Sequence, residues 1–218
     1  MSAIIAFQTI RRIIDLYMMN KPFSQACENN KRPILDILTT VFSENKHVLE
    51  IGSGTGQHAV FFGHQLPHLT WQTSDLLINH QGINFWLDEV GSANVQRPIV
   101  IDLDKTWSMP KGDLPVDGLY TANTLHIISW ALVVKFFEDI KLNLAPNAKV
   151  CIYGPFNYEG KFSSESNANF DLWLKERDVD SGIRDIEEIL LLANSAGLTL
   201  IDDQAMPANN RLLVFSKS

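Results

Sequence analysis

The sequence contains no run of basic residues. Its 218 residues carry 18 Lys and Arg against 25 Asp and Glu, which gives a formal net charge of −7. A nucleic-acid-binding protein usually presents a basic face, so this charge disfavours a DNA or RNA ligand. Cysteine is also scarce, because Cys27 and Cys151 are the two in the chain and neither has metal-site spacing. We therefore expect a reduced, cytoplasmic protein without a disulfide framework or a metal site.

Long apolar runs are missing as well. No stretch reaches the ~20 apolar residues of a membrane span, so we expect no membrane-spanning segment. Residues 3–19 are apolar, but their two adjacent arginines lie in the middle of the segment. A signal peptide would place these charges before its apolar part. We interpret residues 1–19 as an N-terminal extension or the result of an alternative start, and residues 20–218 as a single domain.

Strand-like and helix-like patterns alternate through this domain. The expected strands are 47–51, 69–74, 98–101, 117–122 and 148–153. The expected helices are 31–43 with Pro33 in its first turn, 57–66, 80–90, 129–143 and 184–196. This order predicts a parallel sheet with helices on both faces. Segments 198–206 and 211–216 are joined too closely for a crossover helix, so they should form an antiparallel hairpin. The predicted fold is α/β, with a doubly wound, mostly parallel, seven-stranded sheet and residues 154–183 inserted over the carboxyl ends of its strands.

The most informative stretch is VLEIGSGTGQH at residues 48–58. It predicts a buried strand that ends in a glycine-rich turn and leads into a helix. Gly52, Gly54 and Gly56 let the backbone turn sharply and bring its N–H groups close to a ligand. Glu50 precedes the turn, and its carboxylate would repel a phosphate but attract an ammonium or hydroxyl group.

Polar residues also follow the other predicted strands. Asp75 ends the second strand, Asp102 the third and Asn123 the fourth. Ligands of open α/β sheets bind beyond the carboxyl ends of the strands, so these side chains should share one cleft. An acid at the position of Asp75 typically accepts the hydroxyls of an adenosine ribose, and Asp102 is placed to meet an adenine amino group. Taken singly, each residue has an alternative role in a helix cap or a turn.

A nicotinamide or flavin site is the main rival. Its fingerprint is G-x-G-x-x-G/A. Read from Gly52 the pattern fails, because Gln57 occupies the third glycine position. Read from Gly54 it matches through Ala59, but that register leaves Glu50 unexplained. We therefore prefer the pattern E-x-G-x-G-x-G.

That pattern resembles the first motif of class I S-adenosylmethionine-dependent methyltransferases. A more specific resemblance, to a family of methyltransferase-like proteins of bacteria and animals with an unassigned substrate, rests on the blocks VLEIGSGTGQH, TANTLHIISW, GPFNY, FSSESNANFDLWLKERD, SGIRD and MPANNRLLVF. It extends from about Asn20 to the C-terminus. The resemblance implies the class I fold, bound S-adenosylmethionine and methyl transfer to an acceptor that it does not identify.

The strand-end residues then take expected roles at this cofactor. Glu50 is expected near its amino-acid portion, Asp75 at the ribose and Asp102 at the adenine. Asn123 would help to position the methionine end. The full expected cofactor set is Glu50, Gly52, Ser53, Gly54, Gly56, Asp75, Leu76, Asp102 and Asn123.

The acceptor side is expected at the next strand ends. His126 and Tyr153 are the catalytic candidates, with His126 as general base if the acceptor is a hydroxyl or thiol. A packed, non-catalytic histidine is the alternative. Phe156 and Asn157 of the insertion, with Asn29 from the other side, are expected to bind a small polar substrate. The insertion is equally compatible with a surface flap.

Three functions remain open on this basis. The favoured one is a methyltransferase acting on a small molecule, with no nucleic-acid or membrane ligand. The second is a non-catalytic S-adenosylmethionine-binding module that acts with a protein partner. The third is a nicotinamide-dependent oxidoreductase. A protein methyltransferase is disfavoured because the short insertion leaves little surface for a peptide groove.

Overall fold

The computed structural model describes residues 21–110 and 114–218. Its centre is a seven-stranded sheet with the order β3-β2-β1-β4-β5-β9-β8. The strands of the sheet are β1 (His47–Ile51), β2 (Thr70–Asp75), β3 (Val95–Val100), β4 (Gly118–Ala122), β5 (Lys149–Gly154), β8 (Leu198–Met206) and β9 (Asn210–Lys217). The predicted extension at 1–19 lies outside the described residues.

Pairing within the sheet confirms the predicted topology. β1 pairs in parallel with both β2 and β4, and β4 pairs in parallel with β5. β9 pairs antiparallel with β5 on one side and with β8 on the other. The chain order reverses between β1 and β4, and such a switch point is where open α/β sheets bind ligands.

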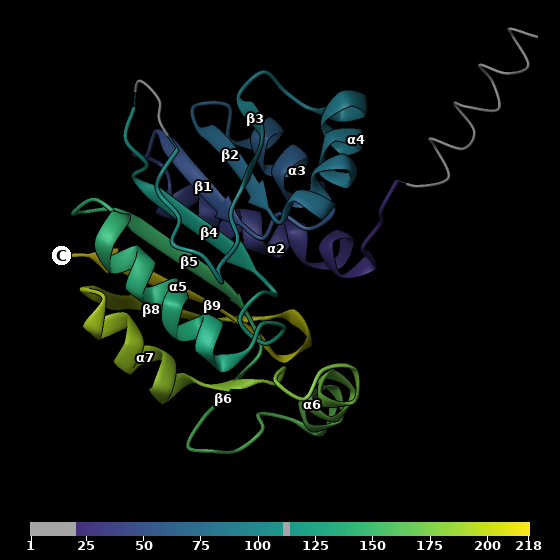
Figure 1. The fold of residues 1–218 in the computed structure, drawn as a ribbon, viewed down its shortest axis with the longest axis vertical. Helices are drawn as coiled ribbons and strands as arrows, with labels where there is room; N and C mark the ends of the chain where they lie inside the picture. The colour runs from purple at the N-terminus through teal and green to yellow at the C-terminus, as the bar shows by residue number, and fades with distance from the viewer. Residues whose placement is uncertain (1–20, 111–113) are drawn as a thin grey trace, which may run out of the picture.

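Helices cover both faces of the sheet (Figure 1). They are α2 (Gln25–Val41), α3 (Gln57–Gln65), α4 (His80–Val90), α5 (Trp130–Asn143), α6 (Glu165–Arg177) and α7 (Ile186–Ser195), with short 3₁₀ turns η1 (Leu77–Asn79) and η2 (Pro207–Asn209). Expected helix 80–90 matches α4 at both ends, and the other expected helices agree to within two residues, except the first. Within 21–110 and 114–218, no helix has the length and apolar character needed to cross a bilayer.

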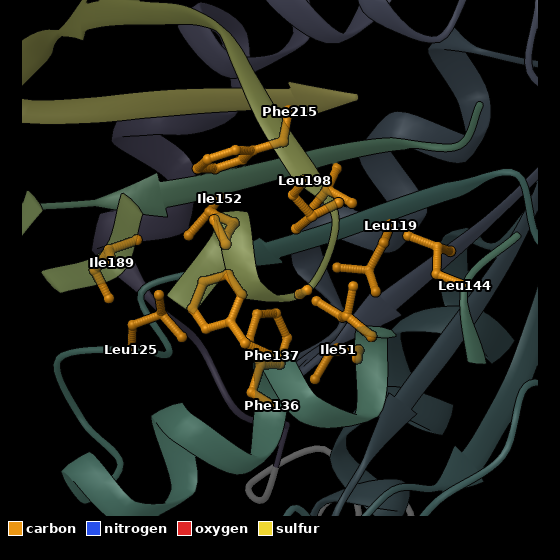
Figure 2. Packing of buried hydrophobic residues seen from close by; sticks show 14 of the residues in the cluster. Ile51, Leu119, Leu125, Phe136, Phe137, Leu144, Ile152, Ile189, Leu198 and Phe215 are labelled. Atoms are coloured by element: carbon orange, nitrogen blue, oxygen red, sulfur yellow. The ribbon is translucent and has the colours of Figure 1, made fainter. Parts of the chain in front are cut away.

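Two hydrophobic clusters fix these layers. One lies under α5 and α7 and contains the buried side chains of Phe136, Phe137 and Ile189 (Figure 2). The other lies under α2 and α3 and contains Ile34 and Phe62. Because strand side chains alternate between faces, each central strand contributes to both clusters.

The first helix begins earlier than its apolar pattern indicated. Ser24 caps α2, and its Oγ accepts a hydrogen bond from Cys27 N at 3.3 Å. The predicted place of Pro33 in the first turn is therefore wrong, because Pro33 lies inside the helix. Its missing N–H leaves the carbonyl group of Asn29 without the usual intrahelical donor. The polar start of α2 lacks the apolar spacing that revealed the rest of the helix.

The insertion after β5 contains structure that the sequence did not reveal. Its helix α6 starts at the cap Ser164, and the two-residue strands β6 (Phe156–Asn157) and β7 (Arg184–Asp185) pair in parallel. Asn167, Asp171 and Leu174 are the buried residues of α6, so the helix has no apolar stripe to detect. In Figure 1 it lies apart from the helix layers, beside the carboxyl edge of the sheet.

Candidate functional site

The glycine-rich turn after β1 is tied to the end of β2. The N–H groups of Gly52 and Ser53 both donate to Ser74 O, at 3.1 and 2.9 Å. Gly54 N donates to Asp75 Oδ2 at 2.7 Å. These bonds hold the turn against the carboxyl end of β2 and fix the position of the Asp75 carboxylate.

Glycine is required in this turn for conformation and for space. Gly52 has φ +73, and a Cβ there would lie 3.0 Å from Thr124 Oγ1. Gly56 has φ +89, and a Cβ there would lie 3.0 Å from Ile83 Cα. Gly54 also has a left-handed φ of +57, but a Cβ there would make only an ordinary contact, with Gly52 O at 4.0 Å. The turn therefore presents bare backbone toward the region in front of the sheet.

Glu50 lies beneath this turn, with 2% of its surface exposed. It accepts hydrogen bonds from Ser53 Oγ at 2.9 Å and from Trp71 Nε1 at 3.1 Å. Burial raises the pKa of this carboxyl to about 7. The expected contact with the amino-acid portion of a cofactor is not what the structure shows, because Glu50 supports the turn from behind.

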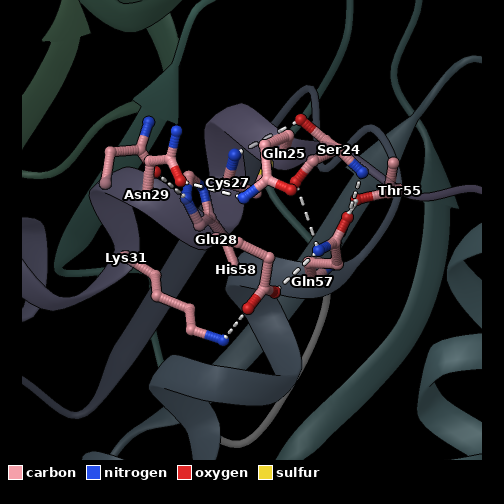
Figure 3. A network of polar contacts seen from close by, with 10 residues as sticks. Ser24, Gln25, Cys27, Glu28, Asn29, Lys31, Thr55, Gln57 and His58 are labelled. Carbon is pink, nitrogen blue, oxygen red and sulfur yellow. Dashed lines mark hydrogen bonds and ion pairs between the residues drawn. The ribbon is translucent and has the colours of Figure 1, made fainter. Parts of the chain in front are cut away.

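The start of α2 covers the turn through one glutamine (Figure 3). Ser24 N and Thr55 Oγ1 both donate to Gln57 Oε1, at 2.6 and 3.0 Å. Gln57 Nε2 donates to Glu28 Oε1 at 2.8 Å and to Ser24 O at 3.3 Å. Glu28 also pairs with Lys31. Gln57, which occupies the third glycine position of the nicotinamide fingerprint read from Gly52, therefore holds the start of α2 against the glycine turn by hydrogen bonds.

A cavity of about 340 Å³ lies in front of the turn. Gly52, Ser53 and Gly54 form one side of it, and Asp75 lies at its edge. The sequence did not single out other residues of its lining, which include Ser24, Cys27, Thr55, His58, Asn79 and Thr124. We call this space the turn cavity.

A smaller cavity of about 160 Å³ continues from it toward β3. Its walls are largely apolar and include Leu76, Ile101 and Leu103. Asp75 and Asp102 contribute carboxylates to it. Lys105 lies 2.9 Å from Asp102 and lowers the pKa of that carboxyl. Asp75 and Asp102 therefore share one cavity, and their expected roles at a ribose and an adenine stay predictions.

A buried histidine forms the floor of the turn cavity. Neutral His58 donates from Nε2 to Asn30 Oδ1 at 2.7 Å and faces the Tyr120 hydroxyl with Nδ1 at 3.3 Å. Burial lowers the pKa of His58 to about 4, so the ring is neutral near pH 7. The sequence did not indicate that His58 lines a cavity, because a single histidine on a helix most often packs against neighbouring side chains without binding a ligand.

Asn123 joins the turn cavity to a second, larger cavity. It follows β4 with a left-handed φ of +56, and its N–H donates to Tyr153 O at 2.8 Å. Asn tolerates this conformation better than most residues. Asn123 lines both cavities, as do Ser24 and Ile127. Asn123 therefore lies where the two cavities meet, and its expected role at the methionine end of a cofactor stays a prediction.

The second cavity has a volume of about 580 Å³ and lies between β4 and α6. His126 lines it, with its ring 5.5 Å from that of Phe170. Burial, and to a smaller extent Arg184, lowers the pKa of His126 to about 4. Trp173 and Arg177 of α6 complete its outer wall. We call this space the α6 cavity.

The other residues expected on the acceptor side lie elsewhere. Tyr153 is buried in the cluster under α2 and α3, and Phe156 is buried in the cluster under α5 and α7. Asn157 is buried and donates to Ile183 O at 3.4 Å. Asn29 is exposed and accepts a hydrogen bond from Gln25. None of these four contributes to the described lining of the three cavities, which corrects the expected roles.

Strand alternation explains the correction for Tyr153. Ile152 lies in the cluster under α5, so its neighbour Tyr153 necessarily faces α2. The sequence located the end of β5, but it did not show toward which face of the sheet the Tyr153 side chain points. The side chains of α6 that do line the cavity are Phe170, Trp173, Leu174 and Arg177. They recur at helical spacing within the block FSSESNANFDLWLKERD, which the resemblance had marked, but the sequence analysis did not assign a helix there.

Solved structures of methyltransferases are similar to this fold. An O-methyltransferase family protein from Burkholderia thailandensis matches with a TM-score of 0.73 at 16% identity, covering 86% of this chain and 56% of that chain. An O-methyltransferase family 2 protein from Planctomyces limnophilus in complex with apigenin gives 0.73 at 14% identity, covering 87% and 58%. Human N-acetylserotonin methyltransferase in complex with SAM gives 0.65 at 15% identity, covering 86% and 56%.

These likenesses establish the class I methyltransferase fold. The chain spans a little over half the length of each of these proteins. A family model matches residues 21–217, almost the whole described region. The chain therefore belongs to the family described as "Protein of unknown function (DUF938)".

Proposed function

We propose that this protein is an S-adenosylmethionine-dependent methyltransferase that acts on a small molecule. The observation that carries the proposal is the meeting of the turn cavity and the α6 cavity at Asn123. One cavity has the bare backbone and acids that suit an adenosyl amino acid. The other offers aromatic walls and a neutral histidine next to it.

The residues present fit this cofactor. Gly54 leaves open space where a side chain would block the cavity. Asp75 has the position to accept ribose hydroxyls, and the apolar walls around Leu76 suit a flat adenine ring with Asp102 at its edge. Human N-acetylserotonin methyltransferase, whose structure is of its complex with SAM, has the same fold and supports the assignment.

S-adenosylmethionine, when bound, supplies a methyl group on an activated sulfonium, which an acceptor lone pair takes while the S–C bond electrons return to sulfur. The protein's own contribution is then orientation and exclusion of water. Asn123 and Ser24, at the junction of the cavities, would position the acceptor. His126 is neutral near pH 7 because its pKa is about 4, so its ring can accept a hydrogen bond from an acceptor hydroxyl and orient it.

We further propose that the protein acts in the cytoplasm on a diffusible substrate. Both Cys27 and Cys151 are free thiols in the structure, as a reducing compartment would keep them. Apigenin is named with the Planctomyces limnophilus structure, which supports a small organic acceptor for this fold. Tyr153, Phe156 and Asn157 are not part of this proposal.

The test is ligand-induced stabilisation of the full chain. S-adenosylmethionine or S-adenosylhomocysteine at ~100 times its Kd should add about 2.7 kcal/mol to the unfolding free energy. Asp75→Asn should weaken binding of both at least tenfold by calorimetry, whereas Asp36→Asn, an exposed acid of α2, should not. Stabilisation by NADH alone would contradict the proposal. Binding of S-adenosylmethionine without turnover of any acceptor would favour a non-catalytic binding module.

A further inference from the structure

The α6 cavity has a feature that the sequence did not indicate, a wall of stacked aromatic rings. The rings of Phe170 and Trp173 lie 5.7 Å apart with planes inclined by 19°. The His126 ring packs edge-on against Phe170, with the planes at 69°. Trp173 keeps 47% of its surface exposed although it lies in a cavity wall. An exposed, ordered aromatic face of this kind suits a flat apolar ligand.

One cation stands at this wall. The Arg177 guanidinium lies 4.6 Å from the centre of the Trp173 ring. Among the described residues Arg177 has no ion pair or hydrogen bond, in a chain whose acids outnumber its bases by 25 to 18. Asp178, also in the lining, accepts instead from Asp180 N at 3.0 Å. The guanidinium is therefore free to pair with an anionic ligand.

A second arginine adds to the positive potential without taking part in the wall. Arg184 lies behind His126, and its side chain donates to the backbone oxygens of Leu125 and Asp180 at 3.0 and 2.9 Å. The carboxylates of Asp171, Asp180 and Glu188 act on this guanidinium from nearby and offset part of its charge. The α6 cavity thus combines apolar rings with one lining guanidinium, that of Arg177, which stacks on Trp173 and has no carboxylate partner among the described residues.

We propose that the α6 cavity binds a small aromatic carboxylate, with its rings against Phe170 and Trp173 and its carboxylate paired with Arg177. This proposal names the acceptor class of the methyltransferase and so rests on the proposed function for its biological meaning. A ring hydroxyl of such a molecule would face Asn123, which lines both the α6 cavity and the turn cavity. The volume of about 580 Å³ admits two fused rings.

The test compares three probes on the full chain by calorimetry and ligand-observed NMR. They are 6-hydroxy-2-naphthoate, the neutral 6-hydroxy-2-naphthamide, and decahydronaphthalene-2-carboxylate, which has the charge but no aromatic rings. We expect the naphthoate to bind at least fivefold more tightly than either of the others. Equal binding of naphthoate and naphthamide would refute the role of the charge, and equal binding of the two carboxylates would refute the role of the aromatic wall.

Substitutions in the cavity wall test the contributions of Arg177 and Trp173 separately. Arg177→Gln should weaken naphthoate binding about five- to tenfold and change naphthamide binding by less than twofold, as loss of a partly exposed charged pair predicts. Trp173→Leu should weaken both naphthyl ligands. Arg32→Gln, an exposed arginine of α2 outside the described lining, should leave all three affinities unchanged. If Arg177→Gln and Arg32→Gln behave alike, the proposal fails.

These binding experiments separate the two proposals. They require no methyl transfer, so aromatic carboxylates that bind when S-adenosylmethionine does not would leave this inference standing and overturn the proposed function. Binding of S-adenosylmethionine with no binding of any naphthyl probe would do the reverse. Unfolding curves of each variant show whether the fold is kept, and both substituted side chains are exposed enough for that to be expected.

Discussion

Replacing Glu50 by glutamine should remove a pH dependence that the buried carboxyl gives to the stability of the wild-type protein. The carboxyl is buried beneath the glycine turn and has its pKa raised from 4.5 to about 7. The folded state therefore holds this proton more tightly than the unfolded state. The preferential protonation of Glu50 in the folded state contributes fully to the free energy of unfolding below pH 4.5, and this contribution is lost as the pH rises through 7. At about 1.4 kcal/mol per pH unit, the loss amounts to roughly 3 kcal/mol.

Glutamine has nearly the same shape, and its side-chain oxygen can still accept from Ser53 Oγ and Trp71 Nε1. Any constant cost of its extra N–H group is the same at every pH. We therefore expect the Glu50→Gln variant to gain roughly 2.5 kcal/mol on the wild type between pH 5 and 8. The assay is urea unfolding at several pH values, with unchanged m-values as the check on two-state behaviour.

Glu28→Gln is the matched control. Its carboxyl has a pKa lowered by the hydrogen bond to Lys31, so it titrates below the range of the experiment. The difference between that variant and the wild type should stay flat from pH 5 to 8. A flat difference for Glu50→Gln as well, or one that moves against the variant with rising pH, would refute the reasoning about the buried carboxyl.

Other predictions follow from the same geometry. Gly52→Ala should lower the free energy of unfolding by about 2 kcal/mol, because φ is +73 and the new Cβ meets Thr124. Gly160→Ala, with φ +68 and open space around its Cβ, should lower it by about 1 kcal/mol. Equal losses in urea unfolding would contradict the contribution of the contact with Thr124. Phe136→Ala should destabilise by about 3–5 kcal/mol through the cavity it leaves, and a loss below 1 kcal/mol would show that the core closes around it. With methyl transfer established, the ratio of wild-type to His126→Gln rates should be constant from pH 7.5 to 5.5, since the pKa of His126 is about 4; a ratio that falls near pH 6.5 would contradict that pKa.

The fold followed from sequence because its signals are local. The apolar run before Gly52 and the acid at Asp75 marked two strand ends, and α4 was predicted at both of its boundaries. Parallel central strands also explain why side-chain direction was missed. These strands are buried on both faces, so apolar side chains point to both. The hydrophobic pattern therefore does not show toward which face of the sheet each side chain points. Val48 and Tyr153 face α2, and Glu50, in phase with Val48, points away from the expected ligand.

The acceptor side was hidden for a different reason. α6 buries Asn167 and Asp171, and the Asp171 carboxylate accepts from Ile183 N at 2.8 Å. A helix held by polar contacts leaves no hydrophobic periodicity in the sequence. The ring stack of Phe170 and Trp173 depends on that helix being formed. Its discovery therefore needed three-dimensional structure, whereas the glycine spacing already predicted the turn after β1.

The position of β9 has a consequence for how the protein is made. This strand follows the other six in sequence, yet it lies between β5 and β8. While the ribosome adds about 5–20 residues per second, β5 has an open edge and β8 has no partner in the sheet. The sheet can be completed only after β9 is synthesised, when β9 pairs with β8 across a short turn and with β5 on its other side. A nascent chain stalled before Asn210 would expose unpaired edges to other chains, which makes this late step the one at which chaperones matter most.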